Sequence, residues 1–208
     1  GPNVVFATAV TDVPLAADQP LAEADNYCDE CQACNASCPS GFFRYGLKNK
    51  VSVSMGGREF SYTERRDYAR CPYVCAGYNG LAKNGRWSTW SPGRFPIPND
   101  DKELKGAYRQ AIPPFNRRPA PDGVSNKQPM VFGFGSRDLS TTCGNCALVC
   151  DPDRAERDRR IASLQQGGVV VQHEDGSVEA VSAKDAKDYL AAMPVERRQD
   201  FEFVEDGD

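Results

Sequence analysis

The stretch that decides how this chain folds runs from residue 28 to residue 39 and reads Cys-Asp-Glu-Cys-Gln-Ala-Cys-Asn-Ala-Ser-Cys-Pro. Its four cysteines are Cys28, Cys31, Cys34 and Cys38. The first three thiols are two residues apart and can surround one face of a metal group, and the fourth follows at the start of a helix. Neighbouring cysteines within one loop seldom reach disulfide geometry. The run therefore predicts metal ligation.

A second group of cysteines repeats the end of this pattern. Residues 142–152 read Thr-Cys-Gly-Asn-Cys-Ala-Leu-Val-Cys-Asp-Pro, so Cys143, Cys146 and Cys150 are spaced as C-x2-C-x3-C. The complete run, C-x2-C-x2-C-x3-C-P, is typical of bacterial ferredoxins, and in those with two clusters the fourth cysteine of each run binds the other cluster. The two groups together predict two [4Fe-4S] clusters that exchange one ligand.

The spacing assigns seven of the ligands, and the number of remaining cysteines limits the choice of the eighth. The first cluster is expected to be held by Cys28, Cys31, Cys34 and Cys150, and the second by Cys38, Cys143, Cys146 and one further thiol. Only Cys71 and Cys75 remain for that last position. Cys71 is favoured, because it precedes Pro72 as Cys38 precedes Pro39. The chain has nine cysteines, so eight would be ligands and one would be spare.

Zinc is the alternative metal for part of this set. Two well-separated cysteine pairs complete a zinc tetrahedron, and Cys71/Cys75 with Cys143/Cys146 would supply them. The first run fits zinc poorly, because three equally spaced cysteines do not form the paired knuckle that zinc prefers. One iron–sulfur cluster with one zinc ion is therefore the competing hypothesis.

Composition excludes several functions. A formal charge of −4 over 208 residues argues against nucleic acid as the main partner. No apolar run reaches the length of a membrane span, and no secretory leader opens the sequence, so a cytoplasmic location is expected. Phosphate-binding glycine motifs are absent from the sequence. His173 is the only histidine and is expected to be a solvated strand residue, so no catalytic residue is predicted.

Five segments are expected along the chain: an N-terminal strand (3–10) and extended arm within 1–27, a first cluster-binding segment (28–50), an insert (51–139), a second cluster-binding segment (140–168), and a hairpin, helix and acidic tail (169–208). Helices are expected at 61–70, from Asn99-Asp-Asp101 to about residue 111, at 153–166 and from Ser182 to Met193, with a weaker one at 40–50. Residues 76–98 are expected to form an irregular loop packed by its aromatic rings, and residues 112–130 a proline-rich tether. Arg65, Arg66 and Arg70 are expected on a solvated helix face.

The sequence resembles the C-terminal iron–sulfur part of corrinoid-dependent reductases, which include the reductive dehalogenases and epoxyqueuosine reductase. The resemblance rests on Thr11-Asp-Val-Pro-Leu15, on the cysteine run before Pro39, and on the shortened second group. It covers residues 3–42 and 140–172. It implies a ferredoxin-like module whose two [4Fe-4S] clusters pass single electrons to a cobalamin. The corrinoid-binding region would lie upstream of residue 3 or in a partner, and the long insert with Cys71 and Cys75 departs from the family pattern.

These observations predict an α+β chain, a bacterial-ferredoxin-like two-cluster module with a long irregular insert and a C-terminal hairpin plus helices. The expected function is electron transfer, as the oxidoreductase component that serves a redox partner or an upstream corrinoid domain. The alternative is a metal-stabilised interaction module with no redox role, in which the aromatic loop shapes a docking surface.

Overall fold

A computed structural model describes residues 9–16, 18–19, 21–44, 50–119 and 143–204. The fold is mixed α/β, with two small antiparallel hairpins and several helices. In chain order the elements are α1 (Ala33–Ala36), β1 (Lys50–Met55), β2 (Arg58–Thr63), α2 (Arg70–Cys75), α3 (Leu104–Arg117), α4 (Asn145–Leu148), α5 (Arg154–Gln165), β3 (Val169–Gln172), β4 (Val178–Val181), α6 (Ala183–Ala192) and α7 (Val195–Arg198). Short 3₁₀ turns occur at Glu23–Asp25 and Asp101–Glu103.

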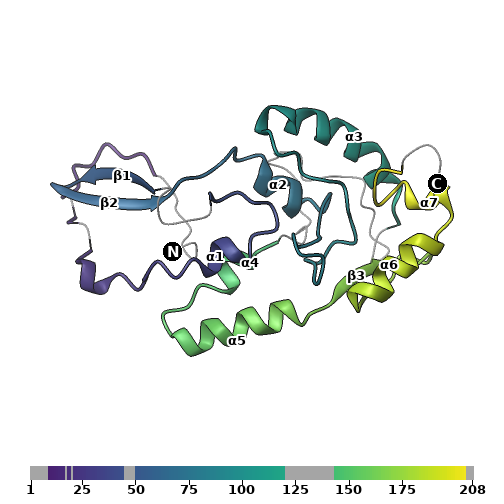
Figure 1. Ribbon diagram of the computed structural model, residues 1–208. Helices are drawn as coiled ribbons and strands as arrows, with labels where there is room; N and C mark the ends of the chain where they lie inside the picture. Colours follow the sequence, from purple (N-terminus) through teal and green to yellow (C-terminus); the bar gives the residue numbers. More distant parts are fainter. Residues whose placement is uncertain (1–8, 17, 20, 45–49, 120–142, 205–208) are drawn as a thin grey trace.

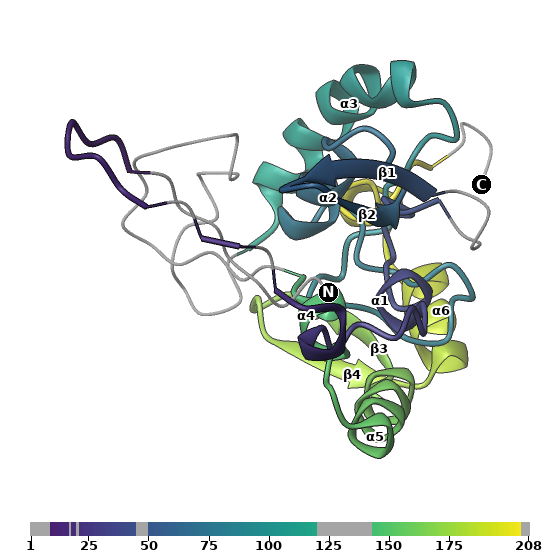
Figure 2. The ribbon, with the colours of Figure 1, turned by 90° about the vertical axis from the view of Figure 1, so that its left-hand side faces the viewer.

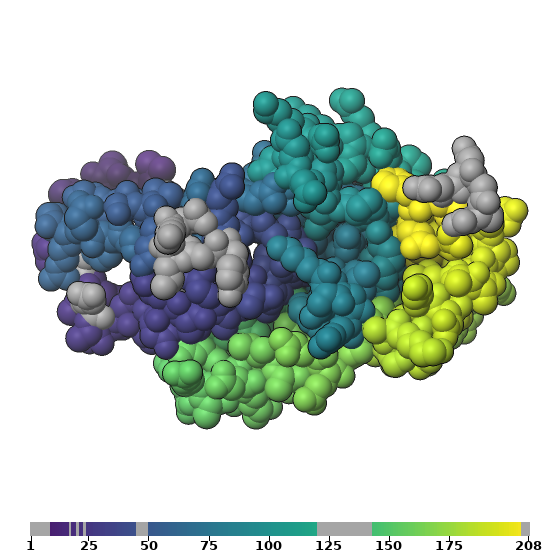
Figure 3. Space-filling model, in the orientation of Figure 1, coloured from purple at the N-terminus to yellow at the C-terminus, as the bar shows by residue number. Residues whose placement is uncertain are grey.

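The elements form an elongated molecule with helices α1 and α4 near its middle (Figure 1). The β1–β2 hairpin lies at one end and the C-terminal helices lie at the other (Figure 1). Helices α1 and α4 lie side by side between them, as both ribbon views show (Figure 2). In the space-filling view, α5 follows one long edge of the molecule (Figure 3, green). The predicted N-terminal strand falls almost wholly on residues 1–8 and the acidic tail on residues 205–208, which lie outside the described residues.

The helix expected at 61–70 was wrong: residues 61–63 belong to β2 of the β1–β2 hairpin, residues 64–69 are irregular, and α2 begins only at Arg70. Val53 pairs with Phe60, and Val51 with Tyr62, in an antiparallel ladder. The turn between the strands is Gly56-Gly57, with φ values of 59° and 74°, which suits a two-residue hairpin turn. Alternating β-branched and aromatic side chains favour a pleated strand over the helix that the hydroxyl cap at Ser61 suggested.

No helix occurs among residues 40–44 either, so the weaker expectation of one at 40–50 was also wrong over these residues. Phe43 instead forms an isolated bridge with Arg65. The rest of that range, residues 45–49, lies outside the described residues, and Lys50 already begins β1.

The main core lies between α2, the loop at 76–98 and α3. Its buried members are Tyr73, Ala76, Tyr78, Phe95, Ala107, Ala111 and Phe115. The rings of Tyr73 and Tyr78 have centroids 5.2 Å apart, and Tyr108 meets both of them edge-on. The loop at 76–98 has no helix or strand of its own and buries Trp87 and Phe95. The prediction of an irregular, aromatically packed loop is therefore confirmed.

Helix α3 begins as predicted but continues further. The side chain of Asp100 accepts a hydrogen bond from the N–H of Lys102 and caps the preceding 3₁₀ turn. The helix then runs to Arg117 and includes Pro113 and Pro114, so its end at residue 111 was predicted wrongly. Buried Phe115 packs on Tyr78 at 5.0 Å between ring centroids, and this contact offsets the backbone hydrogen bonds that proline cannot make. Residues 112–117 are therefore not a tether, and residues 120–130 lie outside the described residues.

The C-terminal elements follow the prediction closely. The side chain of Asp153 caps α5 by accepting hydrogen bonds from the backbone N–H groups of Ala155 and Glu156. The side chain of Ser182 caps α6 by accepting one from the backbone N–H of Asp185. Strands β3 and β4 pair in antiparallel fashion, and α6 packs on β3. Within the described ranges, no helix has the length and apolar character needed to cross a membrane.

Candidate metal centre

The two cysteine groups adopt the same local structure. In the first, Gln32 has a left-handed φ of 61° and the one-turn helix α1 follows it. In the second, Gly144 has a φ of 63° and is followed by the one-turn helix α4. The residues that end the two helices, Ser37 and Val149, share a φ of −85° and a ψ of −1°. The shared spacing C-x2-C-x3-C thus folds twice into one turn-and-helix unit.

The two units are packed against each other through α1 and α4. Buried Asn145 of α4 donates a side-chain hydrogen bond of 3.4 Å to the carbonyl of Ser37, at the end of α1. Asn35 holds the equivalent place in α1, is also buried, and donates at 3.2 Å to the side chain of Gln32. Across this packing, Cys150 of the second run interacts with Cys34 of the first, and Cys38 of the first with Cys143 and Cys146 of the second.

The first group of thiols gathers around Cys34. Its electrostatic neighbours are Cys150, Cys146 and Cys31, so two thiols of the second run approach the first. Burial is the main cause that raises the pKa of Cys34 to about 11. The hydroxyl of Tyr27 contacts the thiol of Cys150 and also lies near Cys28. Cys150 therefore lies within electrostatic range of the first run, and the exchange of ligands between the runs stays a prediction.

The second group of thiols gathers around Cys143. Its electrostatic neighbours are Cys75, Cys38 and Cys146, and burial raises its pKa to about 12. Cys146 in turn has Cys38 and Cys75 as neighbours. Cys38, from the first run, therefore lies among the thiols of the second.

Cys71 and Cys75 both belong to this second group. They lie four residues apart in α2, and their sulfur atoms are 3.7 Å apart. The backbone N–H of Cys143 donates to Cys75, and Cys71 has Cys38 and Cys143 as electrostatic neighbours. The hydrogen bond between the two thiols raises the pKa of Cys71 and lowers that of Cys75. The structure thus places both candidates at the second site.

Arg70 fixes the position of α2 from within the protein. It is 3% exposed, which corrects the expectation that it lies on a solvated face. Its guanidinium group donates to Asp101 at 2.5 Å, to the carbonyl of Pro98 at 2.5 Å and to that of Ser40 at 3.3 Å. The hydroxyl of Ser40 in turn lies 3.1 Å from the sulfur of Cys38. One buried cation therefore connects the start of α2 with the end of the first cysteine run.

Helix α5 holds both cysteine runs through two arginines. Buried Arg157 makes two parallel hydrogen bonds, of 2.8 and 2.6 Å, to the carboxylate of Asp29 in the first run. Arg160 pairs with Asp151 at 2.8 Å and donates to the carbonyl of Leu148, at the end of the second run. A bidentate arginine–carboxylate pair fixes orientation as well as distance. The geometry of the first loop therefore depends on a helix that follows the second.

The chemistry of these donors suits an iron–sulfur cluster. All nine cysteines lie in the described residues as free thiols, of which Cys28 and Cys31 are exposed and the others half-buried. Thiolate ligands select zinc, copper(I) or iron–sulfur clusters. Among the residues that the structure describes, no group of three or more His, Cys, Asp or Glu side chains is positioned to hold a single metal ion. A four-iron cube is wider than one ion and takes one thiolate at each iron, so its four ligands stand further apart.

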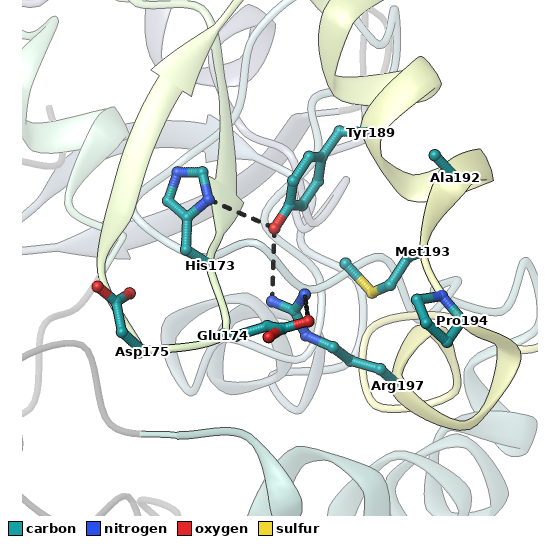
Figure 4. A pocket seen from close by; sticks show the side chains of 8 residues that line it. All are labelled: His173, Glu174, Asp175, Tyr189, Ala192, Met193, Pro194 and Arg197. Atoms are coloured by element: carbon teal, nitrogen blue, oxygen red, sulfur yellow. Dashed lines mark hydrogen bonds and ion pairs between the residues drawn. The ribbon is translucent and has the colours of Figure 1, made fainter.

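His173 lies away from the cysteines, beside a cavity of about 510 Å³ between the C-terminal hairpin and helices α6 and α7 (Figure 4). Its ring nitrogens lie 3.2 Å from the carboxylate of Glu179 and 3.4 Å from the hydroxyl of Tyr189. The side chain is 37% exposed and follows the mostly buried strand β3, so it is only partly solvated, unlike the solvated strand residue that was expected. Arg197, on the opposite wall, donates to the carbonyl of Gln172 at 2.7 Å.

Sequence reasoning missed the residues that hold the cysteine runs in place. Tyr27 directly precedes Cys28, and an aromatic residue beside the run was a signal that could have been used. The pairing of Asp29 with Arg157 spans 128 positions and left no local signal. No protein-family model, no curated protein and no solved structure matches this chain.

Proposed function

We propose that this chain is an electron-transfer module with two [4Fe-4S] clusters that share ligands across the two cysteine runs. The observation that carries the proposal is the crossed position of two thiols. Cys150 interacts electrostatically with Cys34 of the first run, while Cys38 interacts with Cys143 and Cys146 of the second. Cys146 interacts with Cys34 as well, so the two groups are neighbours. A zinc knuckle has no need for this exchange, whereas two-cluster ferredoxins are built on it.

The ligands follow from the two groups of thiols. The first cluster would be held by Cys28, Cys31, Cys34 and Cys150, and the second by Cys38, Cys143, Cys146 and a thiol of α2. When bound, such a cluster accepts and releases one electron at a time. The chain itself provides the thiolates, holds them with Arg70, Arg157 and Asn145, and limits water around the second group.

The two sites differ in exposure, which bears on where electrons enter and leave. Cys28 and Cys31 are exposed, whereas all members of the second group are half-buried. Cluster potentials depend on solvent access and on hydrogen bonds to sulfur. The first site is therefore the one that a partner can approach, and the second is the more shielded.

The proposed recipient of the electrons is a corrinoid-type reductase active site, in an upstream domain or in a partner protein. The support is the resemblance to corrinoid-dependent reductases at residues 11–15 and at the cysteine runs. Single-electron steps are what a cobalamin requires for reductive chemistry, and a cluster pair supplies them one at a time.

Anaerobic purification followed by metal analysis tests the proposal. We expect close to eight iron and eight sulfide per chain, one per expected thiolate ligand, and a paramagnetic signal after reduction with a low-potential dye. Replacing Asp175 with asparagine, in the hairpin turn away from the cysteines, is a control that should change neither value. A colourless protein with zinc and no sulfide would refute it.

A structural zinc site at α2 is the second candidate, and one observation favours it. Two thiolates on one tetrahedral zinc ion lie about 3.8 Å apart, since each zinc–sulfur bond is about 2.3 Å long. The sulfur atoms of Cys71 and Cys75 are 3.7 Å apart. One zinc with about four iron per chain would support this candidate.

A further inference from the structure

The second site has one thiol more than a cluster can use. Five cysteines interact with one another there, namely Cys38, Cys71, Cys75, Cys143 and Cys146. The other four are assigned to the first site, where Cys34 interacts with Cys150, Cys31 and also Cys146. A [4Fe-4S] cluster takes one thiolate at each of its four irons. If the proposed function is right, one thiol of the five is left without an iron.

The surplus lies within α2. Residues four apart share one face of a helix, so Cys71 and Cys75 point the same way. Their sulfur atoms, 3.7 Å apart, are too close to serve two different corners of a cube. Both thiols are therefore directed at one corner, and only one of them can occupy it at a time.

The other residues of α2 hold the helix in place, both before Cys71 and between the two cysteines. Tyr73 and Val74 are at most 1% exposed, and Arg70 is held by its hydrogen bonds to Asp101 and to the carbonyl of Pro98. An exchange of the ligand then needs only a rotation of two cysteine side chains. The helix itself need not move.

Each thiol also has its own support at the site. Cys75 accepts a hydrogen bond from the backbone N–H of Cys143, the first cysteine of the second run. Cys71 is adjacent to Arg70, whose guanidinium group reaches the carbonyl of Ser40 next to Cys38. Neither position is excluded by burial, since both side chains are half-buried.

We propose that Cys71 and Cys75 form one shared ligand position, in which either thiol alone completes the second cluster and the other remains a free thiol beside it. This inference rests on the proposed function and adds to it a reserve ligand. A cluster held in this way survives the loss of either thiol.

Alanine variants test the shared position, because alanine cannot bind iron and is well tolerated in a helix. The proteins to compare are the wild type, Cys71→Ala, Cys75→Ala, the double variant, and Cys146→Ala. Iron, sulfide and zinc are measured per chain after anaerobic reconstitution, together with the electron paramagnetic resonance spectrum of the reduced protein. Cys146→Ala serves as the matched control, since no second thiol shares its place, and it should lose four irons.

The shared position predicts that each single variant keeps eight irons and that the double variant keeps four. The two single variants should differ from each other in the signal of the second cluster, because different thiols complete it. Loss of four irons in only one single variant would show a unique ligand and overturn the inference. Loss in both would show that both thiols are required, as zinc demands, and eight irons in the double variant would show that neither is a ligand; both results overturn it.

A failure of the proposed function is distinguishable from these outcomes. In that case the wild-type protein itself would hold no iron and sulfide. The iron content of the variants tests the shared position only when the wild-type protein holds both clusters.

Discussion

At the scale of single residues, Arg70 contributes most to the organisation of the second site. A buried guanidinium group is costly unless every donor is paired. Here the donors are paired with Asp101 and with the carbonyls of Ser40, Pro98 and Asn99. Because Arg70 directly precedes Cys71, these bonds determine where α2 presents its thiols.

Replacing Arg70 with methionine should lower the free energy of unfolding by about 3 kcal/mol or more, because the loss of one partner of a buried pair leaves the other groups unsatisfied. Replacing Arg159 with methionine is the matched control. Arg159 pairs with Glu156 at the surface of α5, where solvent screening leaves such a pair with little effect on stability. Urea unfolding of both variants measures the difference. Equal losses would contradict the role given to Arg70.

Asp101 should make stability sensitive to acid. Burial raises the pKa of Asp101, but the N–H of Asp67 and the guanidinium groups of Arg70 and Arg66 together lower it below its ordinary value. A lowered pKa in the folded state means that the contribution is present above the unfolded pKa of about 3.9. It is lost as the pH falls through the folded pKa.

The variant Asp101→Asn should therefore lose less stability than the wild type between pH 5 and pH 2, although it is less stable at pH 7. Thermal unfolding at several pH values measures both curves. Asp185→Asn is a control with a carboxylate far from α2. Parallel curves for the wild type and Asp101→Asn would contradict the assignment.

At the scale of elements, the turn before each one-turn helix shows how one backbone shape is made by two residue types. Gly144 adopts a left-handed φ without a Cβ, whereas Gln32 adopts it with one, and its side-chain oxygen accepts the hydrogen bond of Asn35. The left-handed region costs a residue other than glycine about 1–2 kcal/mol. The first run thus carries a strain that the second avoids.

Replacing Gly144 with alanine should destabilise the protein by about 1 kcal/mol, because of the backbone alone. A Cβ at Gly144 would meet no atom within 4 Å. Gly106→Ala, in α3, also has open space and an ordinary helical φ, and it should stabilise the protein by about 0.5–1 kcal/mol. Thermal unfolding measures both variants. A stabilised Gly144→Ala would contradict the left-handed turn.

The elements also show which parts of the fold were predictable. The helices at 153–166 and 182–193 and the C-terminal hairpin were predicted, because their signals are local. The β1–β2 hairpin was missed although Val51-Ser-Val53 and the Gly56-Gly57 turn are visible in the sequence, since a plausible helix cap at Ser61 outweighed them. The end of α3 could not be predicted, because the burial of Phe115 against Tyr78 is a tertiary contact that overrides two prolines.

The candidate site was predictable to a similar extent. Spacing alone predicted that Cys38 and Cys150 would each bind with the other run, and this exchange stays a prediction. In the structure Cys150 is an electrostatic neighbour of Cys34, and Cys38 is one of Cys143. Spacing could not decide between Cys71 and Cys75, since both lie on one face of α2. The arginines that hold the runs, Arg70 and Arg157, act through partners distant in sequence and were not predictable.

At the scale of the whole molecule, three distant segments converge at the two sites. The first run, α2 and the second run meet there, and α5 binds both runs from outside through Arg157 and Arg160. The main core lies on the other side of α2, between that helix and α3. Helix α2 therefore contributes residues both to the cysteine sites and to the aromatic core.

The crossed exchange of Cys38 and Cys150 is the central claim, and single-alanine variants read by electron paramagnetic resonance test it most directly. If the runs exchange their last cysteine, Cys150→Ala should leave the same residual signal as Cys31→Ala, because both lose the first cluster. Cys38→Ala should leave the same residual signal as Cys143→Ala. If Cys150→Ala instead left the signal of Cys143→Ala, each run would hold its own metal group, and the account would be contradicted.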